Sequence, residues 1–249
     1  MVELLFGILL AVVSFVAGVY GTISGGSSLI VLPAMLFIGL SPAIAIGTNR
    51  LSVTTGSLTA ILAFRKSVEF LWKEILVFVG LALVGGFLGA FFIVSIDQAI
   101  ALKIVGILML ATGLLMFFSK GKNELFSKIG PRLKDFFSYV VIFAVNFYRG
   151  FFGGGAGIIV RSVFINLKNF EPTKAIFYAN TIGFFASISA LGVFTIFGSI
   201  DLGYGLIAVV FGAVGSFIGA KIVLQKGKNW TKKFIAIIEI VSGIYFLIK

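Results

Sequence analysis

The chain contains no cysteine and no histidine, and acidic residues are scarce. Its 249 residues include 20 Lys and Arg but only 9 Asp and Glu. Without cysteine there is neither a disulfide framework nor a thiolate metal site. Without histidine the commonest metal ligand and catalytic base is missing. We therefore expect no metal, no cofactor and no enzyme of the familiar histidine-dependent kinds.

Charge of either sign is also rare. Charged residues make up 12% of the chain and hydrophobic residues 59%, whereas soluble proteins carry about 25% charged residues. Apolar runs of about 20 residues, long enough to cross a bilayer, recur along the whole length. Their continuity favours helices over a barrel, whose strands would alternate. The composition predicts an all-α integral membrane protein of the cell (inner, cytoplasmic) membrane, with the lipid bilayer as a partner.

The basic residues have a topological explanation. A net charge of +11 would suggest nucleic acid in a soluble protein, but here Lys and Arg concentrate in short loops between apolar runs, where they orient the helices. No nucleic-acid partner is expected. The first residues, MVELLFGILL, lack the basic region of a signal peptide, and we interpret them as part of the mature fold.

The sequence is duplicated. GTISGGSSLIVLP from Gly21 recurs as GFFGGGAGIIVRS from Gly150, and GGFLGA from Gly85 recurs as GSFIGA from Gly215. Asn49 has a counterpart in Asn180. We divide the chain into a first repeat (1–118), a basic linker (119–135) and a second repeat (136–249). Matched breaks at glycine in a duplicated apolar chain are typical of secondary transporters.

Each repeat divides into five apolar segments. They span 2–20, 27–40, 43–64, 72–94 and 98–118, then 136–151, 155–167, 174–197, 203–224 and 231–248. The loop after the third segment is basic in the first repeat (65–73) but carries only Asp201 in the second, and the next loop reverses this bias. Equivalent loops thus prefer opposite sides of the membrane, which predicts inverted repeats with 65–73, 119–135 and 225–233 in the cytoplasm.

The first two segments of each repeat are short and separated by the glycine cluster. They form either one overlong kinked helix or a re-entrant helical hairpin. With the linker inside and 198–202 outside, the helix at 174–197 supplies the single crossing needed, so 136–168 must return to its own side. This count favours hairpins followed by three spanning helices in each repeat, with both termini outside. Eight full crossings also fit if the broken segments traverse at a steep tilt.

The glycine clusters are the first candidate binding site. A helix broken inside the membrane leaves backbone N–H groups free, and these together with the helix dipole attract anions. Glycine lets the ligand approach closely. Tight packing between helices is the alternative role, and we expect it for Gly85, Gly89, Gly215 and Gly219. At the two breaks we predict substrate binding by Gly25, Gly26, Ser27, Ser28, Gly154, Gly155, Ala156 and Gly157.

Charged and amide side chains within the apolar segments are the second group. A buried charge is costly and normally faces a cavity or a partner, and a guanidinium suits the paired oxygens of an oxyanion. We predict that Arg50 and Arg149 bind the anion. Arg161 either serves coupling or charge pairing or snorkels to the cytoplasmic face, and Glu239 either pairs with an arginine or carries a coupling proton. Asn49 and Asn180 bind substrate or bridge helices.

The motifs resemble those of the TauE/SafE sulfite-exporter family. The likeness rests on the glycine break GTISGGSSLIVLPAML and the Pro-Ala turn SPAIAIGTN, both followed by their repeats, and it spans nearly the whole chain. The resemblance implies a multi-pass permease for sulfite, organosulfonates or related small anions, bound near Gly25, Gly26, Ser27, Asn49, Gly154, Gly155 and Asn180. The chain departs from the family pattern at Arg161–Ser162 and at Arg50, changes that point to a more highly charged anion.

Three other functions compete with a carrier. An intramembrane serine protease needs a base beside its serine and has no histidine to use. A divalent-metal permease is disfavoured by the lack of His, Cys and intramembrane acids. An anion-selective channel could use the same breaks and arginines. We therefore predict a secondary transporter of small sulfur oxyanions such as sulfite and sulfoacetate, with a channel or a carboxylate permease as the alternative and a homodimer as an open possibility.

Overall fold

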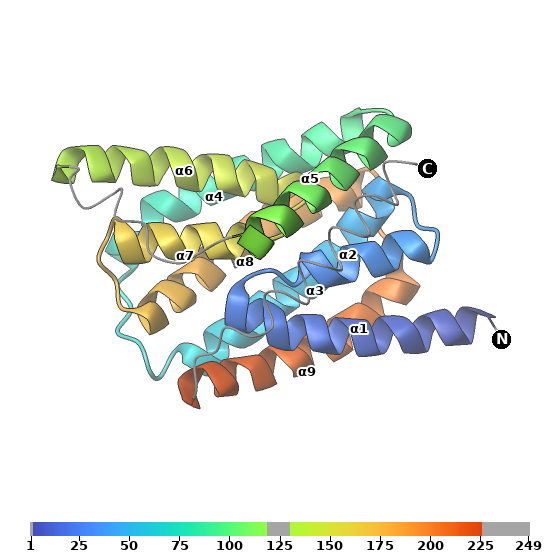
Figure 1. Cartoon of the computed structure of the whole chain (residues 1–249), viewed down its shortest axis with the longest axis horizontal. Coiled ribbons are helices and arrows are strands. Elements are labelled where there is room, and N and C mark those ends of the chain that lie inside the picture. The colour runs from blue at the N-terminus through green and yellow to red at the C-terminus, as the bar shows by residue number, and fades with distance from the viewer. Residues whose placement is uncertain (1, 119–129, 226–249) are drawn as a thin grey trace.

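The computed structural model describes residues 2–118 and 130–225, and every regular element in these ranges is an α-helix (Figure 1). The third, fourth and fifth expected segments of the first repeat, and the third and fourth of the second, are matched to within two residues. The segment expected at 231–248, and Glu239 with it, lies outside the described residues. The helices are α1 (Val2–Ser24), α2 (Ser28–Phe37), α3 (Pro42–Phe64), α4 (Trp72–Ser95), α5 (Gln98–Phe118), α6 (Pro131–Phe151), α7 (Ala156–Asn166), α8 (Pro172–Ile196) and α9 (Leu202–Gln225).

Local chemistry explains where several helices begin. Pro42, Pro131 and Pro172 each occupy the first helical position, where the missing N–H costs nothing and the fixed φ suits a helix. Asp97 caps α5, because its Oδ1 accepts from the backbone N–H of Ala99 at 2.8 Å. Asp201 does the same for α9 by accepting from Tyr204 N–H at 2.9 Å.

The first helix of each repeat is longer than expected. α1 has 23 residues and α6 has 21, whereas α2 has 10 and α7 has 11. We predicted short segments on both sides of each break. This prediction is wrong for the segment before the break and confirmed for the segment after it. α1 continues through Gly21 to Ser24, and α6 begins in a polar turn at Pro131 that hydrophobicity alone would assign to the linker.

The chain reverses direction at both glycine breaks. α2 returns alongside α1, and α7 returns alongside α6 (Figure 1). This is the path of a helical hairpin rather than of one continuous kinked helix. Each hairpin has a long arm and a short arm, and the two hairpins enter from opposite ends of the long axis, so that their turns lie in the interior.

Each long arm packs against the other repeat. α1 lies along α9, α6 lies along α4, and α3 and α8 pack together between them (Figure 1). Glycines make these contacts close. A Cβ on Gly215 or Gly219 would collide with the backbone of Phe15 or Val19 in α1, and one on Gly85 or Gly89 would collide with the backbone of Phe147 in α6. The packing role predicted for these four glycines is confirmed.

Within residues 2–118 and 130–225, four helices are long and apolar enough to cross a bilayer: α1, α4, α8 and α9. The outward faces carry large apolar side chains, for example Leu76, which is 64% exposed on α4, and Leu206, which is 64% exposed on α9. In water such faces would be unfavourable, but they suit contact with lipid tails. α3 has the same length as α1 but carries Asn49, Arg50 and Ser52 in its buried middle.

Candidate functional site: a cationic cavity between the two breaks

The two glycine breaks touch each other. The backbone N–H of Gly157, at the start of α7, donates to the carbonyl of Gly25, in the turn after α1, at 3.2 Å. A Cβ on Gly25 would lie 2.7 Å from Gly157 Cα, and a Cβ on Gly157 would lie 2.6 Å from Gly25 Cα. Gly25 also has a φ of +87°, which favours glycine. Only glycine therefore fits at either side of this contact.

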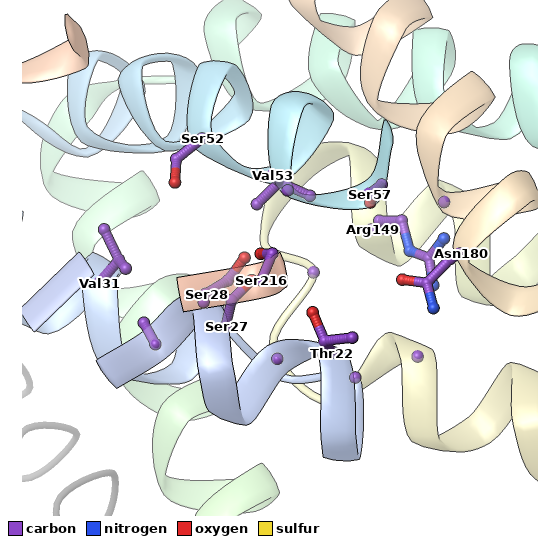
Figure 2. Close-up of a pocket in the computed structure, with 18 of the residues that line it drawn as sticks. Thr22, Ser27, Ser28, Val31, Ser52, Val53, Ser57, Arg149, Asn180 and Ser216 are labelled. Carbon is purple, nitrogen blue, oxygen red and sulfur yellow. The ribbon is translucent and has the colours of Figure 1, made fainter. Parts of the chain in front are cut away.

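A cavity of about 60 Å³ lies beside this contact (Figure 2). Since a buried water needs roughly 10–15 Å³, the cavity has room for a ligand of about four to six heavy atoms. Its walls come from both repeats. The lining residues that carry polar side chains are Thr22, Ser27, Ser28, Arg50, Ser52, Ser57, Arg149, Arg161, Asn180 and Ser216.

Three arginines make the cavity cationic. Arg50, Arg149 and Arg161 are only 1%, 6% and 8% exposed. Arg50 Nη2 donates to Phe152 O at 2.8 Å. Arg161 donates to two carbonyls, from Nη1 to Ile23 O at 2.6 Å and from Nη2 to Thr22 O at 3.0 Å.

Each of these arginines retains a buried nitrogen without a hydrogen-bond partner among the described residues. These nitrogens are Nε of Arg50, Nη1 of Arg149 and Nε of Arg161. Among the described residues that line the cavity, none is acidic. Buried cations need a partner, and an oxyanion in the cavity would provide the compensating negative charge.

Hydroxyl and amide groups complete the lining. Ser28 Oγ accepts from Asn49 Nδ2 at 2.9 Å, so Asn49 orients Ser28 from outside the cavity. Ser52 Oγ donates to Ala208 O at 2.9 Å, and Asn180 Nδ2 donates to Ile176 O at 2.8 Å. Asn180 and Arg149 lie together at one end of the cavity (Figure 2), where a Cβ on Gly183 would approach Arg149 Nη1 to 2.6 Å. The missing Cβ at Gly183 leaves room for this guanidinium.

Residues 10–246 match the family described as sulfite exporter TauE/SafE. The chain belongs to this family. A probable membrane transporter protein of Haemophilus influenzae is 32% identical over 91% of this chain and 89% of its own length. The probable membrane transporter protein YfcA of Escherichia coli K12 is 30% identical over 98% and 90%, and one from Sinorhizobium sp. is 29% identical over 96% and 91%. No solved structure matches.

Membership of the TauE/SafE family makes the chain a membrane transporter. It agrees with the family resemblance of the sequence motifs, and it points away from an enzyme. Because the alignments cover nearly all of each relative, the likeness extends over both hairpins and the helices that follow them.

The structure brings together most of the predicted site residues but not all. Gly25, Ser27, Ser28, Arg50, Arg149, Gly157, Arg161 and Asn180 line the cavity. The guanidinium of Arg161 points inward to the α1 carbonyls, so it does not snorkel to a surface.

Five predicted residues lie outside the cavity lining. A Cβ on Gly26 would lie 2.8 Å from Leu29 Cδ1, and one on Gly154 would collide with the Leu29 side chain, so both glycines face apolar packing. Gly155 has a φ of +72° and provides the turn, whereas Ala156 packs in an apolar cluster with Val160 and Phe164. Asn49 does not line the cavity but donates to Ser28, which does.

Sequence reasoning missed Thr22, Ser52, Ser57, Ser216 and Gly153. Hydroxyl residues within apolar helices are usually taken for packing or back-bonding to the helix. The one available signal was the hydroxyl-rich run LSVTTGSLT in α3 (51–59), which is too polar for a lipid-facing helix.

Proposed function

We propose that this protein is a secondary transporter that binds a small oxyanion in the cavity between its two glycine breaks. The observation that carries the proposal is the set of three buried arginines around one cavity, each with a nitrogen that has no hydrogen-bond partner among residues 2–118 and 130–225. Oxyanion oxygens accept bidentate and charge-assisted hydrogen bonds from guanidinium groups. Hydroxyls from Ser27 and Ser57, which also line the cavity, supply further donors for the remaining oxygens.

Sulfur oxyanions are the substrate class we favour. The family description names sulfite, and sulfite, with four heavy atoms, suits a cavity of about 60 Å³. A sulfonate such as sulfoacetate is larger and would require the cavity to widen. A small carboxylate would present one oxygen fewer to the three arginines than sulfite does, so we rank it below sulfite.

We further infer inverted repeats that operate by alternating access in the cytoplasmic membrane. The packing partners support this inference, because α1 with α9 corresponds to α6 with α4, and α3 with α9 corresponds to α8 with α4. The opposite charge bias of equivalent loops supports it as well. A cysteine at Ser67 should resist an impermeant thiol reagent added outside intact cells, whereas a cysteine at Ile196, which is 82% exposed, should react. Equal labelling at both positions would contradict the inverted topology.

Transport by purified protein in liposomes tests the function. We expect saturable uptake of radiolabelled sulfite that unlabelled sulfite inhibits more strongly than acetate does. Ser57→Phe would place a ring in the cavity and should abolish this uptake, whereas Ser67→Phe, in an exposed loop, should leave it intact. Unitary currents in planar bilayers would instead indicate a channel, and uptake unaffected by Ser57→Phe would place the substrate elsewhere.

A further inference from the structure

The three arginines of the cavity have different hydrogen-bond partners. α1 and α6 both end inside the protein, and the last turn of any helix leaves carbonyls without intrahelical partners. A cation at this end also interacts favourably with the helix dipole. Arg161 donates to the carbonyls of Thr22 and Ile23 in the last turn of α1, and Arg50 donates to that of Phe152 directly after α6.

These contacts cross between the repeats. Arg50 belongs to the first repeat and caps a helix of the second, while Arg161 belongs to the second and caps a helix of the first. The capped carbonyls occupy matching places, since Ile23 in GTISGG corresponds to Phe152 in GFFGGG. The arginines themselves do not match, because Leu32 stands at the position equivalent to Arg161 and Thr181 at that equivalent to Arg50. The two repeats thus reach the same cap from different helices.

Arg149 has no comparable partner in the described part of the chain. It lies in the last turn of α6, and its Nη1 is buried there without a hydrogen-bond partner. Its guanidinium packs against the space left by the missing Cβ of Gly183. An arginine that donates to helix-end carbonyls stabilises the fold whether or not a ligand is present. A buried guanidinium that lacks a partner destabilises the fold until an anion arrives.

We propose that Arg149 is the primary anion ligand, and that Arg50 and Arg161 are positioning residues that fasten the broken end of each hairpin to the opposite repeat. This assignment rests on the proposed anion site and refines it. Because Arg50 and Arg161 both line the cavity, their charges link a bound anion to the carbonyl ends of α6 and α1. Binding therefore draws together the two breaks that meet at Gly25 and Gly157.

Thermal unfolding of the purified full chain, with and without sulfite, tests this division of roles. Arg149→Gln should keep or raise the melting temperature of the anion-free protein and should weaken sulfite binding at least tenfold. Arg50→Gln and Arg161→Gln should lower the anion-free melting temperature by about 3–5 °C while sulfite still stabilises the protein. Arg161→Lys should recover part of that loss, because an ammonium can still donate to the carbonyls of Thr22 and Ile23.

Transport kinetics separate positioning from simple damage to the fold. Arg149→Gln should raise KM, whereas Arg161→Gln should mainly lower the maximal rate, measured at a temperature where every variant is folded. The proposal is overturned if Arg149→Gln destabilises the anion-free protein as much as Arg161→Gln does, or if Arg161→Gln loses sulfite binding without losing stability. If the wild type gains no stability from sulfite, sulfonates, sulfate or carboxylates, the anion site fails. In that case the melting temperatures of the anion-free variants alone test whether Arg50 and Arg161 cap the two helices.

Discussion

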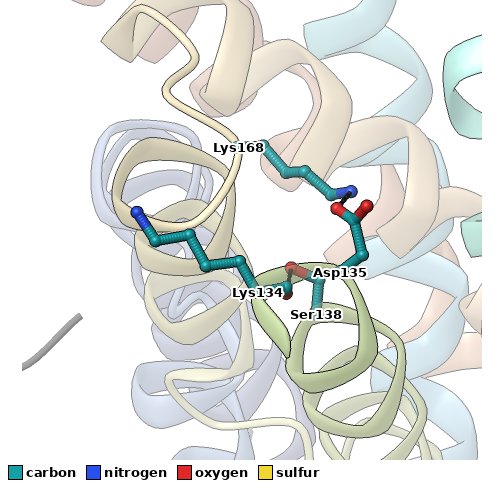
Figure 3. Close-up of polar contacts among 4 residues, drawn as sticks. All are labelled: Lys134, Asp135, Ser138 and Lys168. Atoms are coloured by element: carbon teal, nitrogen blue, oxygen red, sulfur yellow. Dashed lines mark hydrogen bonds and ion pairs between the residues drawn. The ribbon is translucent and has the colours of Figure 1, made fainter. Parts of the chain in front are cut away.

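Hairpin α1–α2 begins on exposed leucines, whereas hairpin α6–α7 begins on a polar turn that contains Lys134 and Asp135. In the second hairpin, Lys168, after α7, reaches Asp135 near the start of α6 at 2.5 Å (Figure 3). Its ammonium also lies 5.6 Å from the ring centre of Phe78 and 5.5 Å from that of Tyr139. In the register of the glycine motifs, the counterparts of Asp135 and Lys168 are Phe6 and Gly39.

This difference separates what the two hairpins share from what they do not. Both have the backbone reversal at glycine and an arginine that caps the broken helix. The open end of each hairpin, where the long arm begins and the short arm finishes, differs between the two. It carries an ion pair in the second hairpin and apolar groups in the first. The side chains at the breaks have diverged too, since Ser27 and Ser28 face the cavity in the first break, whereas Ala156 and Gly157 hold the same positions in the second.

The largest expected effect comes from the contact between the breaks. Gly25→Ala and Gly157→Ala each place a methyl group against the opposite backbone, which costs about 1–3 kcal/mol. Gly25→Ala should be worse, because its positive φ adds a further 1–3 kcal/mol or so. Melting temperature and the yield of monodisperse protein measure the difference. Gly192→Ala is the control, since no atom lies within 4 Å of a Cβ there. Equal tolerance at all three positions would contradict the close contact.

A medium effect should separate the two equivalent asparagines. Asn180→Ala removes a cavity-lining amide and should weaken sulfite binding by about 1 kcal/mol while changing stability little. Asn49→Ala removes the donor to Ser28 Oγ and should lower the unfolding free energy by a similar amount. Isothermal titration and thermal unfolding measure these two quantities. If Asn49→Ala weakened binding and Asn180→Ala lowered stability, the assignment of the two asparagines would be reversed.

The smallest effect belongs to the open ends of the hairpins. Asp135→Asn should cost no more than about 1 kcal/mol, because Asp135 is 54% exposed and such pairs are screened by solvent and salt. Lys168→Met should cost a similar amount, and the double variant should cost less than the sum of the two. Unfolding at low and high ionic strength measures this coupling. Phe6→Asn at the matching place in α1 should show no salt dependence at all.

Much of the fold was accessible from the sequence because long apolar segments and N-terminal prolines mark helices strongly. The starts of α3 and α8 follow from Pro42 and Pro172. The full length of α1 could not be predicted, because Gly21 indicates a helix end in the sequence. In the structure Gly21 lies within the helix, which continues to Ser24.

The site was accessible only in outline. Intramembrane arginines and glycine clusters identified its location, but the direction of a side chain depends on helix rotation and tertiary packing. Gly26 and Gly154 therefore looked equivalent to Gly25 and Gly157, although they face Leu29. The carbonyls that Arg161 caps lie 138 and 139 residues away along the chain, and no local pattern indicates such a pairing.

The packing of α1 against α9 has a consequence for biogenesis. Gly18 meets Gly212 and Ser216, so the partner of the first helix is synthesised about 190 residues later. At roughly 5–20 residues per second, α1 waits for some 10–40 s before its close-packed glycine face can be covered. The first repeat cannot complete its own packing, and two halves divided within 119–129 should accumulate only when they are produced together.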